Sequence, residues 1–237
     1  MTRRRWIADE FSDSHAALLG PHAEHLAVVL RARVGQQFDI VAGEASRSGR
    51  VTSVAPDRVE FELGDELPQT STPRITLLMA VFKFDRMEWA IEKCTELGVT
   101  KIVPIIARRT DAHLTHAAEK RVERWQRIAQ QAAEQSRGTA PPNIGTPIKL
   151  IAAAQMTAGT RILLSENERK LSLKDALAAH SPSEELLLAC GPEGGWIEEE
   201  LTLFSKSGWT SASLGNTILR AETAAIAATA IAFAELS

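Results

Sequence analysis

The sequence predicts an α/β protein in which a small β-rich module precedes a larger domain built on a mostly parallel sheet. Two observations carry this prediction. In the first part of the chain, runs such as Arg58–Leu63 alternate polar and apolar residues with period two, as half-buried strands do. From Arg74 onward, apolar runs of strand length alternate with segments of helical periodicity, which favours parallel strands covered by helices. A length of 237 residues, 44% of them hydrophobic, is enough to build packed cores for both parts.

The β-rich module is expected within residues 1–70. Residues 26–63 are interpreted as short strands, of which the clearest are Gln37–Ala42, Arg50–Val54 and Arg58–Leu63, with Gly43–Gly49 as the loop between the first two. The stretch Gly64–Pro73 then loses periodicity and gathers proline and small polar residues. We place the domain boundary there, so the second domain covers residues 74–237.

The second domain is predicted to alternate strands and helices along its length. A helix over Asp85–Leu97 has Asp85 and Glu88 at the spacing of a capping box and Gly98 as its stop signal. A longer amphipathic helix is expected over Ala117–Arg137. The other expected elements are the strands Ile75–Phe82, Lys101–Ile106, Ile162–Leu164, Leu186–Cys190 and Thr210–Leu214, and a final helix over Ala221–Leu236.

Composition and charge limit the possible partners. The net charge is −3, so contacts with nucleic acid would need local clusters of Lys and Arg. The two cysteines, Cys94 and Cys190, form no Cys-x-x-Cys pair, and nothing completes the pair His113 and His116, so no metal site is expected. The longest weakly polar stretch is too short to span a bilayer, and Arg3–Arg5 do not lead into an apolar run, so we expect a cytoplasmic protein without membrane contact.

A glycine-bearing loop, Gly191-Pro192-Glu193-Gly194-Gly195, follows an apolar strand and precedes a helical run. In an open α/β sheet, ligands bind beyond the carboxyl ends of the strands, and glycine lets backbone approach a ligand closely. The loop has neither the lysine of a phosphate-binding P-loop nor a Gly-x-Gly-x-x-Gly order, and it could be an ordinary tight turn. Three glutamates follow at residues 198–200 and would repel an anion, so a neutral or zwitterionic ligand is favoured over a phosphate.

A second loop, Leu214–Thr223, also links a strand to a helix and adds charged groups. Arg220 could orient a carboxylate or stabilise developing negative charge, and Glu222 could accept a proton or hold Arg220 in place. The alternative interpretation is an exposed Arg–Glu pair with little effect.

Four motifs follow one another in the second domain. They are Lys83-x-Asp85-Arg86 continuing to Ile91-x-Lys93-x-x-Glu96-Leu97-Gly98-Val99, then Glu123-Arg124-Trp125 leading to Glu134-Gln135-Ser136-Arg137, then the loop Gly191–Gly195, then Leu214-Gly215 with Ile218-Leu219-Arg220-Ala221-Glu222-Thr223-Ala224. Taken together and in this order, they resemble the RsmE family of 16S ribosomal RNA uridine N3-methyltransferases, which belongs to the SPOUT superfamily. His25-Leu26-x-x-Val29-Leu30-Arg31 also resembles the start of that family's PUA-like RNA-binding barrel.

The resemblance implies a SPOUT-type fold with a deep trefoil knot after a small PUA-like β-barrel. It also implies methylation of N3 of a specific uridine in 16S ribosomal RNA, within the small ribosomal subunit, with S-adenosylmethionine as methyl donor, no metal, and a homodimer formed through the final helix. Arg220 would stabilise the uridine anion, and Glu222 would hold Arg220 or relay the proton. Cofactor contacts are expected from Ser165, Glu166, Leu188, Cys190, Gly191, Glu193, Gly194, Gly195, Leu214, Gly215, Ile218, Leu219 and Arg220. RNA contacts are expected from Arg3, Arg4, Arg5, His25, Arg31, Arg33, Lys83, Arg86 and Arg137.

Three other functions stay open at this point. The chain could be an RNA-binding protein that keeps the fold without the cofactor, although the glycines and Arg220 argue against it. It could be a methyltransferase of the same superfamily that acts on transfer RNA or on a ribose hydroxyl. A metabolic nucleotide-binding enzyme is a more distant alternative.

Overall fold

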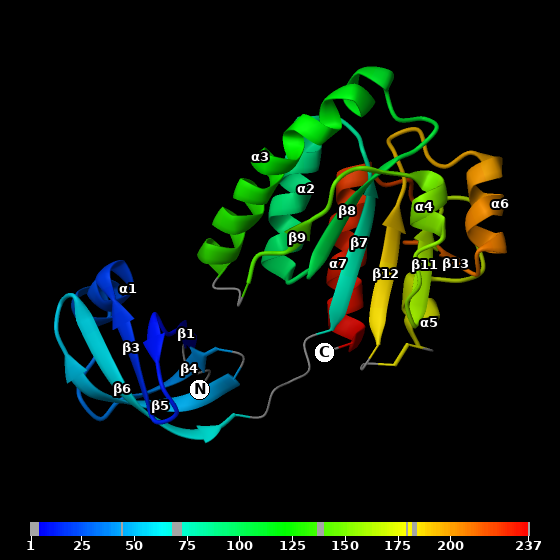
Figure 1. The fold of residues 1–237 in the computed structure, drawn as a ribbon. Coiled ribbons are helices and arrows are strands. Elements are labelled where there is room, and N and C mark those ends of the chain that lie inside the picture. The colour runs from blue at the N-terminus through cyan, green and yellow to red at the C-terminus, as the bar shows by residue number, and fades with distance from the viewer. Residues whose placement is uncertain are drawn as a thin grey trace. The chain divides into compact units, whose positions relative to one another are not determined.

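The computed structural model describes residues 5–43, 45–67, 73–136, 140–178, 180–181 and 184–236, with the side chain of Arg5 excluded. The chain divides into two compact units, Met1–Thr70 and Ser71–Ser237. Figure 1 shows a strand-rich first unit and a second unit in which helices flank a central sheet. The predicted fold class, a β-barrel module followed by an α/β domain with a parallel sheet, is confirmed.

Unit 1 is a six-stranded curled sheet in the order β1-β4-β5-β6-β3-β2. One pairing, β1 with β4, is parallel and the others are antiparallel. The strands are β1 Arg5–Ile7, β2 Glu10–Phe11, β3 His15–Leu19, β4 Gln37–Ala42, β5 Ala45–Val54 and β6 Arg58–Glu66.

The two edges of this sheet are joined by one bent stretch of chain. Strands β1 and β2 are separated by only two residues, and the hydrogen-bond partner changes between them. The Ala8 N–H donates to the Val41 carbonyl, and the next N–H, of Asp9, donates to the Ala17 carbonyl, each at 2.9 Å. The sheet therefore closes on itself and removes the exposed edges that an open sheet would leave. Fully buried Leu18 and Phe61 lie in its core.

Unit 1 departs from the sequence prediction in two places. The start of the 26–63 region is helical, because α1 (Gly20–Glu24) leads into a π-helical turn, η1 (His25–Val29). Strand β5 begins at Ala45, so most of the expected Gly43–Gly49 loop is strand. Gly49 is needed inside that strand, because a Cβ there would come within 2.2 Å of the Ile40 side chain. A glycine that permits close strand packing was thus mistaken for a turn glycine.

Unit 2 has a sheet in the order β10-β8-β7-β12-β11-β13, with β9 also on β8, and its described pairings are all parallel. Its strands are β7 Arg74–Ala80, β8 Lys101–Ile106, β9 Asn143–Ile144, β10 Ile148–Lys149, β11 Thr160–Leu164, β12 Glu185–Cys190 and β13 Thr210–Ala212. Its helices are α2 Phe84–Leu97, α3 Ala112–Ser136, α4 Leu150–Ala154, α5 Leu173–Leu177, α6 Glu198–Lys206 and α7 Ala221–Leu236.

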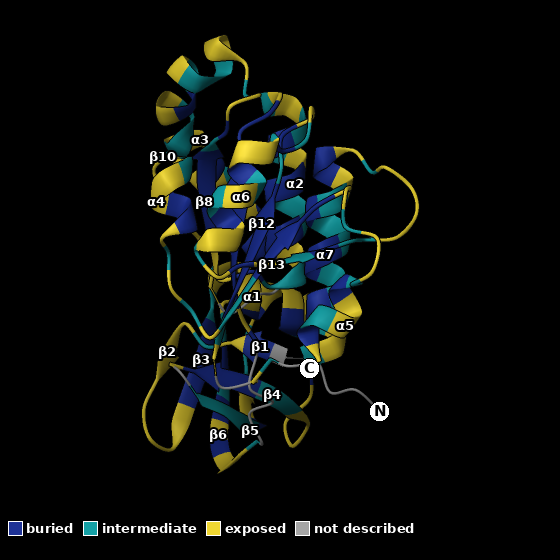
Figure 2. Cartoon of the chain, turned by 90° about the vertical axis from the view of Figure 1, so that its right-hand side faces the viewer, coloured by how far each residue is buried: buried dark blue, intermediate teal, exposed yellow. Residues whose placement is uncertain are grey.

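Alternation along the central strands divides unit 2 into two hydrophobic cores. Leu77 of β7 and Leu188 of β12 pack in the core that holds side chains of α2, α3, α5 and α7. Their sequence neighbours Leu78 and Leu187 pack in the core that holds side chains of α4 and α6. Both faces are therefore covered, which is why the strands are apolar at nearly every position (Figures 1 and 2).

The ends of two helices differ from the prediction. At α2, the N-cap residue is Lys83, with no side-chain cap, so the expected capping box is wrong, whereas Gly98 does end the helix with a φ of 102°. Glu88 instead binds Arg124 of α3, with distances of 2.6 and 2.8 Å between carboxylate oxygens and guanidinium nitrogens. Helix α3 begins at Ala112, five residues earlier than expected, where the Asp111 carboxylate accepts the His113 N–H at 2.7 Å.

The strand order places β12 between β7 and β11, so the last part of the chain enters the middle of a sheet begun much earlier. Helix α7 then packs against α2, α5 and the β7–β12 pair. The trefoil knot implied by the resemblance stays a prediction. Among the described residues, no helix has the length and apolar character of a membrane span.

Candidate functional site

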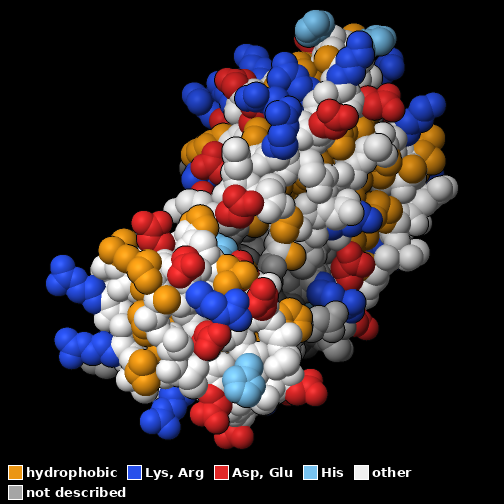
Figure 3. Space-filling view, turned by 60° about the vertical axis from the view of Figure 1, so that its left-hand side comes forward, with side chains coloured by type: hydrophobic (Ala, Val, Ile, Leu, Met, Phe, Trp, Pro, Cys, Tyr) orange, Lys and Arg blue, Asp and Glu red, His pale blue; other side chains and the backbone are white. Residues whose placement is uncertain are grey.

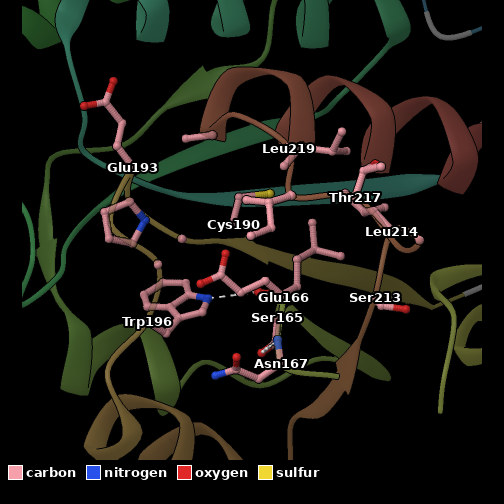
Figure 4. Close-up of a pocket in the computed structure, with 18 residues that line it drawn as sticks. Ser165, Glu166, Asn167, Cys190, Glu193, Trp196, Ser213, Leu214, Thr217 and Leu219 are labelled. Atoms are coloured by element: carbon pink, nitrogen blue, oxygen red, sulfur yellow. Dashed lines mark hydrogen bonds between the residues drawn. The ribbon is translucent and has the colours of Figure 1, made fainter. Parts of the chain in front are cut away.

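Three loops meet at the carboxyl ends of β11, β12 and β13 and line one pocket (Figure 4). Its lining residues are Leu164, Ser165, Glu166, Asn167, Cys190, Gly191, Pro192, Glu193, Gly195, Trp196, Ser213, Leu214, Gly215, Thr217, Ile218, Leu219, Ala221 and Ala224.

Most of the predicted cofactor residues share this pocket, although three do not line it. Leu188 is fully buried in the sheet core. Gly194 lies against the side chain of Arg109, and Arg220 is exposed beside the pocket residue Leu219. The predicted residues that line the pocket are Ser165, Glu166, Cys190, Gly191, Glu193, Gly195, Leu214, Gly215, Ile218 and Leu219.

The loop after β12 forms the first wall, and its glycines are required by close contacts. A Cβ on Gly191 would lie 3.1 Å from the indole of Trp196. Gly195 has a φ of 71°, and a Cβ there would also lie 2.7 Å from a carboxylate oxygen of Glu166. Since most L-residues avoid this backbone conformation, Gly195 is constrained twice. Trp196 holds the wall in place, because its indole N–H donates to the Leu164 carbonyl at 3.0 Å.

The loop after β11 forms a second wall and is tied to β13. The Ser165 N–H donates to the Ala212 carbonyl at 3.0 Å, and the Ser165 hydroxyl accepts the Asn167 N–H at 3.2 Å. Further along, the Leu173 N–H donates to the Ser213 carbonyl at 2.9 Å. These bonds set the distance between two of the three walls before any ligand binds.

The loop after β13 forms the third wall. Gly215 has a φ of 122°, which only glycine adopts easily, and it faces open space. Leu214 and Leu219 are half-buried, whereas Ile218 is 79% exposed, a large apolar side chain at the pocket mouth. An apolar surface of this kind suits the face of a planar base.

Arg86 links two of these walls from outside the pocket. One guanidinium nitrogen, Nη1, lies 3.4 Å from a Glu193 oxygen and 3.6 Å from a Glu222 oxygen. Glu222 is buried, and its second carboxylate oxygen has no hydrogen-bond partner in the described structure. The buried Glu222 carboxylate faces Arg86, and Arg220 is exposed just before the same helix, so the prediction that Glu222 holds Arg220 stays a prediction, with no ion pair between the two in the described structure.

Glu200 has a structural role that the charge argument against anions did not foresee. It is buried at the start of α6, where its two oxygens accept the N–H groups of Arg108 at 2.7 Å and Ile197 at 3.0 Å. Glu198 and Glu199 are exposed, and none of the three lines the pocket. The carboxylates that do line it are those of Glu166 and Glu193.

The residues predicted to bind RNA lie in both units. In unit 1, His25, Arg31 and Arg33 are exposed, and Arg31 has a φ of 51°. In unit 2, Lys83 is exposed, and Arg86 is bound to the two glutamates described above. Arg3, Arg4 and Arg137 lie outside the described residues, and of Arg5 only the backbone, in β1, is described.

The sequence reasoning missed three notable residues. Trp196 follows directly after Gly194-Gly195, and a large aromatic residue at that position could have indicated a wall of the site. Arg109 donates a hydrogen bond to the Gly194 carbonyl, and Arg108 is exposed beside it at the end of β8. Two arginines at the carboxyl end of a predicted strand were a signal for this edge of the sheet.

The two cysteines are buried thiols in the core beside α7. Burial raises the pKa of Cys94 to about 12 and raises the pKa of Cys190 as well. Cys190 therefore lines the pocket as a neutral thiol and not as a nucleophile. Within the described parts of the chain, no group of three or more His, Cys, Asp or Glu residues could hold a metal ion.

The family model for the RNA methyltransferase domain matches residues 69–233 of this chain. The parallel sheet and its pocket thus define an RNA methyltransferase domain. A ribosomal RNA small subunit methyltransferase E from Synechocystis sp. is 30% identical over 221 residues, which cover 91% of this chain and 72% of that relative. The chain belongs to the ribosomal RNA small subunit methyltransferase E family, as the resemblance to RsmE predicted.

Two solved structures resemble nearly the whole chain. The crystal structure of a ribosomal RNA small subunit methyltransferase E from Neisseria gonorrhoeae, bound to S-adenosyl methionine, has a TM-score of 0.67 and 31% identity, and the match covers 97% of this chain and 96% of that one. A putative methyltransferase from Legionella pneumophila, in complex with the same cofactor, has a TM-score of 0.66 and 27% identity, with coverage of 99% and 98%.

Proposed function

We propose that this protein transfers a methyl group from S-adenosylmethionine to N3 of a specific uridine in 16S ribosomal RNA. The observation that carries the proposal is the pocket at the carboxyl edge of the sheet, where Gly191, Gly195 and Gly215 bring backbone to the surface in a chain of this family. The related structure from Neisseria gonorrhoeae holds S-adenosylmethionine. The pocket here has the apolar surfaces and the exposed backbone that a nucleoside cofactor needs.

The bound cofactor would supply an activated methyl group, so the protein has to bind and orient the two reactants. The loops after β12 and β13 would hold the adenosine moiety between backbone groups and the apolar side chains of Trp196, Leu214 and Leu219. Uridine N3 becomes nucleophilic when its proton leaves. Arg220, exposed beside Leu219, would stabilise the resulting anion of the base. Glu222 would act through Arg86, by keeping the first turn of α7 in place.

RNA would be recognised by cationic side chains around the pocket and on unit 1. Figure 3 shows Lys and Arg side chains gathered on unit 2 next to the exposed histidines of α3. Arg109 lies next to a wall of the pocket, through its hydrogen bond to the Gly194 carbonyl. Since N3 lies on the Watson–Crick edge, the uridine would have to leave its base pair to reach the pocket. Exposed basic residues of unit 2 include Lys83, Arg108, Arg109, Lys120, Arg124 and Arg127.

The working form would be a homodimer that acts on the small ribosomal subunit in the cytoplasm. Helix α7 is apolar along nearly its whole length, and one side of it, with Ile226, Ala227 and Ala230, is only half-buried in the single chain. A second copy would cover this side. Sedimentation equilibrium of the purified protein tests the dimer, and a monomer at micromolar concentration would exclude it.

The reaction can be tested with purified components. Wild-type protein, small ribosomal subunits that lack the modification and methyl-labelled S-adenosylmethionine are incubated together, and the RNA is digested to nucleosides. The label should appear in N3-methyluridine. Label in another base or on a ribose hydroxyl would favour the related methyltransferases, and binding of RNA without any transfer would favour a non-catalytic protein.

A further inference from the structure

Charge is distributed unevenly in the pocket. None of its described lining residues is Lys, Arg or His, and its charged side chains are the carboxylates of Glu166 and Glu193. A site with this lining attracts cations and repels anions, unless a neighbouring group offsets the negative charge. The two glutamates differ in this respect.

Glu193 is offset and directed away from the pocket. Its carboxylate lies 3.4 Å from Nη1 of Arg86, which supplies a positive charge. Figure 4 shows the Glu193 side chain extending away from the other labelled side chains. The negative charge of Glu193 therefore contributes little to the field inside the pocket.

Glu166 has no such partner in the described structure. It makes no ion pair or side-chain hydrogen bond there, and Figure 4 shows its side chain lying beside Trp196, inside the ring of lining residues. One of its carboxylate oxygens lies close to Gly195, since a Cβ on that glycine would be only 2.7 Å from the oxygen. Arg109 lies on the same side, because its Nη1 would be 3.9 Å from that Cβ of Gly195, but this nitrogen donates to the Gly194 carbonyl and forms no ion pair with Glu166 in the described structure. The unpaired charge that faces a ligand is thus negative.

We infer that Glu166 makes the pocket selective for a cationic ligand, so that S-adenosylmethionine binds more tightly than the product of its demethylation. This inference rests on the proposed function. When the methyl group forms its bond to N3 of uridine, the carbon–sulfur bond breaks, its electron pair stays on sulfur, and the N3 proton is released. Sulfur changes from a sulfonium cation to a neutral thioether. Glu166 therefore favours exchange of the product for a new methyl donor.

Isothermal titration calorimetry of three ligands measures this selectivity without turnover. The ligands are S-adenosylmethionine, its neutral thioether product, and an analogue with a protonated amine in place of the sulfonium. Wild-type protein should bind both cations about five- to tenfold more tightly than the thioether, the effect of one partly solvated charge pair. The preference should shrink as salt is raised. Glu166→Gln should weaken both cations by that factor and leave the thioether within about twofold.

Glu199→Gln is the matched control, because Glu199 is exposed at the start of α6 and does not line the pocket. It should keep the wild-type preference. An equal loss for all three ligands in Glu166→Gln would overturn the inference, since the carboxylate would then bind a part that they share, such as the ribose hydroxyls. An unchanged profile in Glu166→Gln, or no preference in the wild type, would also overturn it. Failure of all three ligands to bind wild-type protein would instead overturn the proposed cofactor, and this inference with it.

Discussion

Replacing Arg86 with alanine leaves the buried Glu222 carboxylate without its counter-charge. The exposed fraction of the Glu222 side chain is 5%, and that of Arg86 is 33%. A charge pair at about 4 Å contributes about 1 kcal/mol in bulk water and about 4 kcal/mol near a protein surface. Breaking a fully buried pair costs about 3–5 kcal/mol. Because Arg86 is partly solvated, we expect Arg86→Ala to lower the free energy of unfolding by about 1–3 kcal/mol.

The double variant Arg86→Ala/Glu222→Gln separates charge from packing. Glutamine has the shape of glutamate without the charge, so the double variant should recover most of the lost stability, with a coupling free energy of about 1–2 kcal/mol. Urea unfolding followed by tryptophan fluorescence suits this test, since Trp89, Trp125, Trp196 and Trp209 all lie in unit 2.

Arg124→Ala is the control for loss of an arginine that bridges elements at the surface. Arg124 binds Glu88 through two hydrogen bonds, but its own side chain is 54% exposed, so its loss should cost less than that of Arg86. A change below about 0.5 kcal/mol in Arg86→Ala would refute the reasoning, because that is the range of ordinary surface substitutions. So would a double variant no more stable than Arg86→Ala.

Three further predictions concern the pocket. Gly195→Val should weaken S-adenosylmethionine binding at least tenfold in calorimetry, because a β-branched residue at a φ of 71° is strained and its Cβ would displace Glu166. An unchanged affinity would show that this loop is not part of the site. Arg220→Ala should lower the methylation rate by a factor of about 100 or more, while its affinity for the cofactor stays within about threefold, since Arg220 does not line the pocket. A wild-type methylation rate in this variant would contradict the proposed role of Arg220. Iodoacetamide at pH 8 should label neither cysteine of the native protein and both in urea, because burial and the raised thiol pKa values keep Cys94 and Cys190 neutral; rapid native labelling would contradict the burial. The free energy of unfolding should fall as the pH rises from about 9 towards the folded-state pKa of Cys94, about 12, because the thiols then ionise only in the unfolded chain.

Local patterns predicted the second unit well because its strands are buried on both faces. Lys101–Ile106 and Ala221–Leu236 were expected with the bounds that the structure shows. Runs of apolar residues between helical segments leave little choice of secondary structure. The start of α3 was missed, although Asp111 before the helix was a readable N-cap signal.

Features that depend on distant contacts could not be predicted from one sequence. Gly49 resembled a turn glycine, but in the sheet it pairs with Phe38 of β4, and a Cβ there would collide with the Ile40 side chain. The π-helical turn at His25–Val29 has no local signature that separates it from other short structure.

The candidate site shows the same division. The glycine loops were visible as motifs, whereas the contacts of Arg86 with Glu193 and Glu222 join three separate elements. Arg220 lies just before α7 and Glu222 in its first turn, and side chains two residues apart at a helix start point in different directions, so Arg220 is exposed whereas Glu222 is buried.

The central claim is the methylation of one uridine in small-subunit ribosomal RNA, and mass-spectrometric mapping of that RNA tests it most directly. RNA is compared from cells that contain the protein, cells that lack it, and cells that lack it but carry either the wild-type gene or the Arg220→Ala variant. We predict that a single N3-methyluridine disappears without the protein, returns with the wild type and stays absent with the variant. An unchanged N3-methyluridine in cells that lack the protein would contradict the claim.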